Sequence, residues 1–158
     1  MTPSASPLLA AHVAAAERHV DGEAMLLPWL LRWLMATRRI GMRTQIASEV
    51  PWLGRRVDLA LLNARGTATA FELKIGRLQR VLEQAAYNGS SFHRSWVVTG
   101  NRPRDQGVAW ARELGLGVIV VQPPSVRLVV PATARHPDHG ALRQLRTAIA
   151  ARAAGAPV

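Results

Sequence analysis

The sequence predicts an α/β fold in which a mixed central sheet is flanked by helices. Three consecutive strand patterns joined by short turns favour an antiparallel meander in residues 42–75. A later succession of strand, helix, strand, helix and strand favours parallel neighbouring strands covered by helices. The length of 158 residues and the apolar share of 49% suffice for one core and exclude a disordered or collagen-like chain. We therefore expect one domain over residues 1–158, with flexible tails at 1–7 and 153–158.

Two helices are expected before the strands. The first spans Leu8 to about His19, and the second starts near Asp21, a good N-cap residue, and is stopped by Gly41. Pro28 must start or kink the second helix because proline has no N–H to donate. The apolar stripe of this helix is formed by residues spaced three and four apart, namely Met25, Leu26, Trp29, Leu30, Trp33 and Leu34.

The meander that follows is marked by alternating side chains and by turn residues. Its strands are expected at Met42–Val50, Arg56–Asn63 and Ala68–Ile75, with turns at Pro51–Gly54 and at Gly66. Because a strand places successive side chains on opposite faces, these ranges also decide which side chains can meet.

The rest of the chain alternates helices and strands. Gly76 ends the third strand, and the helix after it has one apolar face and one polar stripe, the stripe holding Arg77, Arg80, Gln84 and either Tyr87 or Asn88. The expected elements are a helix at Leu78–Gly89, a strand at Ser95–Thr99, a helix at Arg104–Leu114, a strand at Gly117–Gln122, an edge strand at Val126–Val130 and a last helix through Leu142, Leu145 and Ile149.

Composition narrows the classes of function. The 20 basic and 10 acidic residues give a net charge of +10, which attracts polyanions such as nucleic acids, although an arginine-rich composition alone gives the same count. The absence of Cys excludes a disulfide framework, a thiolate nucleophile and a Cys-ligated zinc. No apolar run is long enough to span a membrane, and the apolar stretch from Pro7 to Ala16 lacks the preceding cations of a secretory signal. We expect a cytoplasmic protein with no membrane partner.

Two acidic residues, Asp58 and Glu72, lie in otherwise apolar strands, where a carboxylate needs a cation or hydrogen bonds to offset its burial. Glu72 and Lys74, the only lysine of the chain, are two positions apart and project from the same face of their strand. If the strands around Gly66 pair as a hairpin, Asp58 faces the same pocket. Such a group suits a hard divalent cation, Mg²⁺ or in its place Mn²⁺, which would stabilise charge on a phosphodiester and lower the pKa of a bound water.

The pattern of Asp58, thirteen intervening residues and then Glu72-Leu73-Lys74 resembles the PD-(D/E)XK nuclease superfamily. Val57 stands where that motif commonly has proline. The resemblance implies a restriction-endonuclease-like core of a helix, three antiparallel strands, a helix and a further strand in residues 22–99, with additional strands and a helix on the C-terminal side.

The same resemblance implies roles for individual residues. Asp58 and Glu72 would bind the metal together with the Leu73 carbonyl, and Lys74 would position the attacking water. A helical acid would approach the site, and Glu23 and Glu49 compete for that role. Gln84 resembles a glutamine that many members place near the substrate. Cationic side chains flank the expected pocket and can hold phosphates, namely Arg55, Arg56, Arg77 and Arg80.

The leading interpretation is a Mg²⁺-dependent nuclease that hydrolyses phosphodiester bonds, above all in DNA, and a homodimer is among the expected partners because nucleases of this kind often dimerise to cut both strands. The first alternative is a catalytically inactive module that keeps the fold and binds nucleic acid or a partner protein. The second is a generic α/β interaction domain whose acidic strand residues, Asp58 and Glu72, form structural salt bridges with Lys74. Trp52 is the candidate for stacking on a base. His93 is expected to have a structural role or to contact a phosphate, and His136 and His139 are expected to lie in a polar loop.

Overall fold

The computed structural model describes residues 22–76 and 78–155. A six-stranded mixed sheet, in the order β1-β2-β3-β4-β5-β6, forms its centre. The first three strands are antiparallel, β3, β4 and β5 are parallel, and β6 returns antiparallel to β5. Both the expected meander and the expected parallel neighbours are therefore confirmed. The strands are β1 (Gln45–Trp52), β2 (Arg55–Leu62), β3 (Ala68–Lys74), β4 (Arg94–Thr99), β5 (Gly117–Gln122) and β6 (Ser125–Val130).

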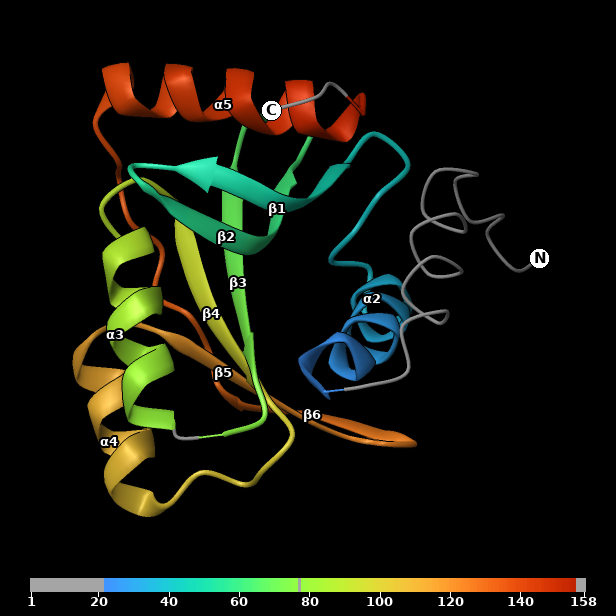
Figure 1. Ribbon diagram of the computed structural model, residues 1–158, viewed down its shortest axis with the longest axis vertical. Helices are drawn as coiled ribbons and strands as arrows, with labels where there is room; N and C mark the ends of the chain where they lie inside the picture. The colour runs from blue at the N-terminus through green and yellow to red at the C-terminus, as the bar shows by residue number, and fades with distance from the viewer. Residues whose placement is uncertain (1–21, 77, 156–158) are drawn as a thin grey trace.

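Helices cover both faces of the sheet, as Figure 1 shows. The helix α2 packs on one face, where its leucines join Phe71 and Trp96 in one buried cluster. On the other face, α3 and α4 share a second cluster with Val97 and Val118, and α5 shares a third with Ala60 and Ala70. The helical segments are the short 3₁₀ helix η1 (Gly22–Met25), α2 (Leu26–Ala36), α3 (Leu78–Asn88), α4 (Asp105–Glu113) and α5 (His139–Ala153).

The first strand and its turn differ from the sequence-based prediction. β1 begins at Gln45 rather than Met42 and continues through Pro51 and Trp52, which pair with β2. Proline is tolerated there because β1 is an edge strand, so its missing N–H breaks no ladder. The reversal is confined to Leu53 and Gly54, both with positive φ (48° and 73°), as in a two-residue hairpin turn.

The expected helix that Gly41 would stop is shorter. α2 ends at Ala36 because Arg38 adopts a left-handed conformation with a φ of 57°. The Arg39 N–H donates to the Leu34 carbonyl and the Arg38 N–H to the Met35 carbonyl, the two bonds of a Schellman cap. Pro28 lies in the first turn of α2, where a missing N–H costs little.

Several predictions fall on residues outside 22–76 and 78–155. They are the helix at Leu8–His19, the Asp21 cap, the tail at 1–7, the end of the tail at 153–158, and Arg77 as a phosphate contact. Within the described residues, α5 extends to Ala153, which lies at the start of that second tail. None of the described helices is long and apolar enough to cross a membrane.

Candidate functional site

The candidate site lies where β2 and β3 separate. Their backbone ladder runs from the Leu62–Ala68 pair to the Leu59–Phe71 pair, so the next opposed positions are Asp58 and Glu72. At this point a side-chain hydrogen bond replaces the backbone hydrogen bonds between the strands: Asp58 Oδ2 accepts a hydrogen bond of 2.8 Å from the Leu73 N–H. The hairpin geometry predicted around Gly66 thus brings both carboxyl groups to one place on the sheet.

Glu72 is the more buried carboxyl group, with only 5% of its surface exposed. Its Oε1 accepts a hydrogen bond of 2.6 Å from Asn88 Nδ2 at the end of α3. The carboxyl groups of Glu72 and Asp58 lie close enough for each to shift the pKa of the other. Both side chains are therefore fixed in orientation, Asp58 by the β3 backbone and Glu72 by the helix that covers this face.

Burial dominates the electrostatics of this pair. It raises the pKa of Glu72 from 4.5 to about 8, and the negative charge of Asp58 contributes in the same direction. Burial also raises the pKa of Asp58, against the opposing effect of the Leu73 N–H. Near neutral pH the pair therefore retains a proton, because two adjacent buried carboxylates repel each other. A cation that replaces this proton between the two carboxylates would relieve the same repulsion.

Lys74, at the end of β3, projects from the same face of the strand as Glu72. Its Nζ forms an ion pair with Glu23 Oε1 of η1, and both side chains are partly exposed. The negative charge of Glu23 also contributes to the raised pKa of Asp58. The structure thus places Glu23 beside Lys74 and near Asp58, and a role for Glu23 in the site stays a prediction.

Glu49, the competitor for the outer acidic position, also lies near the pair. It interrupts the pairing of β1 with β2, between the Ser48–Leu59 and Val50–Val57 pairs, and has a left-handed φ of 55°. Its charge raises the pKa of both Asp58 and Glu72, while its Oε2 forms an ion pair of 3.1 Å with Arg56. Both acids therefore surround the pair, and the choice between them stays open.

A cavity of about 670 Å³ opens from Glu72 between the β1–β2 hairpin and α3. The predicted residues Arg55, Arg56, Arg80 and Gln84 all line it. The guanidinium of Arg55 stacks over the Tyr87 ring with its carbon 4.1 Å from the ring centre. The cavity that reaches Glu72 is therefore lined by three arginines from two separate elements, with Glu83 as its other acidic residue.

Asn88 was predicted only as one of two alternatives on the polar stripe of α3, and its contact with Glu72 was not predicted. It completes a helical row with Arg80 and Gln84, which are spaced four apart, and this spacing was the available signal. Only 7% of the surface of Asn88 is exposed, and its Nδ2 donates a hydrogen bond to Glu72. Asn88 therefore belongs to the site rather than to a solvated stripe. The Leu73 N–H donates a hydrogen bond to Asp58, whereas metal ligation by the Leu73 carbonyl stays a prediction.

The other singled-out residues have structural roles. His93 Nδ1 accepts a hydrogen bond of 3.0 Å from the Ala68 N–H at the start of β3. Asp138 accepts bonds from the Gly140 and Ala141 N–H groups and so caps α5. His139 is the first residue of that helix, so the prediction that it lies in the polar loop is wrong. Trp52 is partly buried against the α5 cluster instead of projecting as a stacking platform.

The site offers few side-chain oxygens to a metal ion. No group of three or more His, Cys, Asp and Glu side chains in the described residues is arranged to hold a metal. The pair of Asp58 and Glu72 remains, and this is a donor set for Mg²⁺, which usually keeps several waters and binds one or two protein carboxylates. The residues present therefore fit a hard ion bound mainly through water and substrate oxygens.

Fold and site together define an α/β protein with a six-stranded mixed sheet and a buried carboxylate pair. No protein-family model matches the chain, and no curated protein matches it. The structure is similar to that of the SPO1766 protein of unknown function from Silicibacter pomeroyi, with a TM-score of 0.64 and 18% sequence identity over 87% of this chain and 89% of that chain. At this identity the likeness concerns the fold alone.

Proposed function

We propose that this protein is a Mg²⁺-dependent nuclease of the PD-(D/E)XK type, with a restriction-endonuclease-like core, that hydrolyses phosphodiester bonds, most readily in DNA. The observation that carries the proposal is the carboxylate pair. Asp58 and Glu72 meet where β2 and β3 separate, and Lys74 follows on the same strand face. This arrangement matches the spacing that the motif requires in sequence.

The pair supports metal binding on chemical grounds. Its two acids repel each other as anions, and a divalent cation relieves this repulsion as a proton does. Asp58 and Glu72 would hold Mg²⁺, with the Leu73 carbonyl as a further oxygen ligand. Bound there, Mg²⁺ would neutralise charge on the phosphate and lower the pKa of a coordinated water.

The side chains around the pair have separate tasks in hydrolysis. The water oxygen forms a bond to phosphorus, the bond from phosphorus to the leaving oxygen breaks, and the proton released by the water is passed to that oxygen through solvent. Lys74 donates hydrogen bonds that orient the attacking water, while its ion pair with Glu23 fixes the ammonium group. Asn88 and the Leu73 N–H hold the carboxylates, so little reorganisation is needed.

The arginines that line the cavity support a nucleic acid as the substrate. Arg55, Arg56 and Arg80 line the cavity that leads to Glu72, and a guanidinium can bind two phosphate oxygens at once. The chain as a whole carries +10, which favours association with a polyanion at low salt. Gln84, on the same wall of the cavity, is available to donate a hydrogen bond to the substrate.

One observation favours the alternative, a nuclease-like module that binds nucleic acid or a partner protein without turnover. Lys74 is engaged by Glu23, so its ammonium is neutralised unless substrate or metal separates the two side chains. Binding that occurs with equal affinity in the presence and absence of divalent metal, without cleavage, would select this alternative.

The test is a panel of supercoiled plasmid, single-stranded DNA and branched DNA, each incubated with Mg²⁺, Mn²⁺ or a chelator. Wild-type protein should cleave at least one substrate only with metal, and Asp58→Ala and Lys74→Ala should abolish cleavage. Circular dichroism checks that both variants fold, and Arg143→Ala, at an exposed position of α5, is the control that removes a charge away from the site. Cleavage that survives in both Asp58→Ala and Lys74→Ala would refute the assignment.

A further inference from the structure

A second cavity, of about 420 Å³, lies on the α2 face of the sheet. Thr69 and Phe71 of β3 line it, whereas Glu72 alternates to the opposite face. The cavity is therefore separated from the carboxylate pair by the sheet itself. Its volume falls within the range of about 300–1,000 Å³ that is usual for small-molecule sites.

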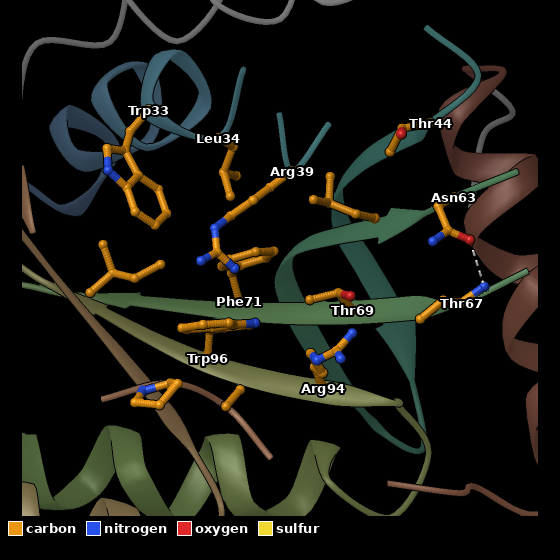
Figure 2. Close-up of a pocket in the computed structure, with 14 residues that line it drawn as sticks. Trp33, Leu34, Arg39, Thr44, Asn63, Thr67, Thr69, Phe71, Arg94 and Trp96 are labelled. Carbon is orange, nitrogen blue, oxygen red and sulfur yellow. Dashed lines mark hydrogen bonds between the residues drawn. The ribbon is translucent and has the colours of Figure 1, made fainter. Parts of the chain in front are cut away.

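One wall of this cavity is a stack of planar groups, which Figure 2 shows. The Arg39 guanidinium carbon lies 5.3 Å from the centre of the Trp33 ring and 5.7 Å from that of Trp96. Trp96 in turn stacks on Phe71, with ring centres 6.2 Å apart and an angle of 11° between the rings. Aromatic rings and guanidinium planes are the surfaces on which proteins stack nucleic-acid bases.

The cavity also holds an anion-binding group. Arg94, at the start of β4, lies beside Thr69 of β3, as Figure 2 shows, and lines the cavity. Thr44, Asn63 and Thr67 add hydroxyl and amide groups on the same side, and no Asp or Glu is among the lining residues. Within the described residues, two guanidinium groups thus face one cavity without a carboxylate to neutralise them.

A planar stacking wall and an uncompensated cation beside it fit a ligand that has both a flat aromatic part and a negative group. We propose that this cavity binds a nucleotide, with the base stacked against the accessible Arg39 and Trp33 and the phosphate held by Arg94, while the buried Trp96 supports Arg39 from the core side. The nucleotide is either a free mononucleotide or one unit of a single strand. This site does not depend on the carboxylate pair, so it stands or falls separately from the nuclease proposal.

The test uses the full chain and measures quenching of Trp fluorescence by deoxynucleoside monophosphates, the matching nucleosides and inorganic phosphate. A nucleotide should bind at least about tenfold more tightly than either of its parts, because a hydrogen bond to a charged group is worth about 1.5–3 kcal/mol. A short single-stranded oligonucleotide, with and without a terminal phosphate, is measured in the same way. Tighter binding of the oligonucleotide than of the mononucleotide would identify a unit of a single strand as the ligand, and weaker binding would identify the free mononucleotide.

Variants assign the binding to the cavity. Arg94→Gln and Arg39→Gln should each weaken nucleotide binding by about tenfold or more, whereas Arg143→Gln makes the same charge change on α5 and should leave it unchanged. The proposal is overturned if wild-type protein does not bind the nucleotide, if inorganic phosphate binds as tightly, or if the Arg94 and Arg143 variants behave alike.

Discussion

The buried carboxyl of Glu72 makes a quantitative prediction about stability and pH. Its pKa is about 8 in the folded protein against 4.5 in the unfolded chain, so the folded state holds the proton more tightly. The stabilisation that the protonated Glu72 gives to the folded state is fully present below about pH 4.5, and it is lost as the pH rises to about 8. At about 1.4 kcal/mol for each pH unit, the free energy of unfolding falls by at most about 5 kcal/mol over this range.

The perturbation that tests this is Glu72→Gln, which keeps the shape and an oxygen to accept from Asn88 but cannot ionise. The variant should resemble wild type at about pH 4 and be a few kcal/mol more stable at about pH 9. Glu83→Gln is the matched control, because Glu83 lies on the same cavity but is exposed, and its profile should follow wild type.

The assay is urea unfolding followed by Trp fluorescence at a series of pH values, with a chelator present. Parallel pH profiles for wild type and Glu72→Gln would refute the reasoning, because they would show that Glu72 ionises in the fold as it does in the unfolded chain. The charge of Asp58 contributes to the raised pKa of Glu72 after burial, so Asp58→Asn should make the profile shallower, but less so than Glu72→Gln.

Three further outcomes are expected. Mg²⁺ at about 100 times its Kd should raise the free energy of unfolding of wild type at about pH 8 by about 3 kcal/mol, and thermal melts should show no such gain in Glu72→Gln. Leu53→Asn should stabilise the protein by about 1 kcal/mol in urea melts, because Leu53 has a φ of 48° that asparagine adopts more readily, and an unchanged midpoint would contradict this. Gly117→Ala should cost about 1–3 kcal/mol, because the new Cβ would collide with the buried Trp96 ring, and a melt like that of wild type would show that the ring can move aside.

The strand pattern was predictable because alternation and turn residues are local signals. The range Ala68–Ile75 predicted β3 to within one residue, and the same alternation placed Glu72 apart from Phe71. The end of α2 was not predictable, because the left-handed residue is Arg38 rather than the glycine that usually marks such a cap.

The candidate site was predictable in part. Asp58 and Glu72 stand out as acids among apolar neighbours, but the bond from Asn88 depends on how α3 docks on the sheet. The α2-face cavity had no sequence signal at all. Trp33, Arg39 and Trp96 come from a helix, the segment after it and a distant strand, and only tertiary packing brings them together.

The alternation along β3 has a consequence for how this protein can vary. Thr69 and Phe71 face the α2-face cavity, while Glu72 faces the cavity beside α3. Inserting or deleting a single residue inside β3 would therefore exchange the faces of these side chains and disable both cavities at once. Length changes in the Asn63–Thr67 connection leave that parity untouched. Natural and designed variants should therefore differ in length at the connection and keep the seven residues of the strand intact.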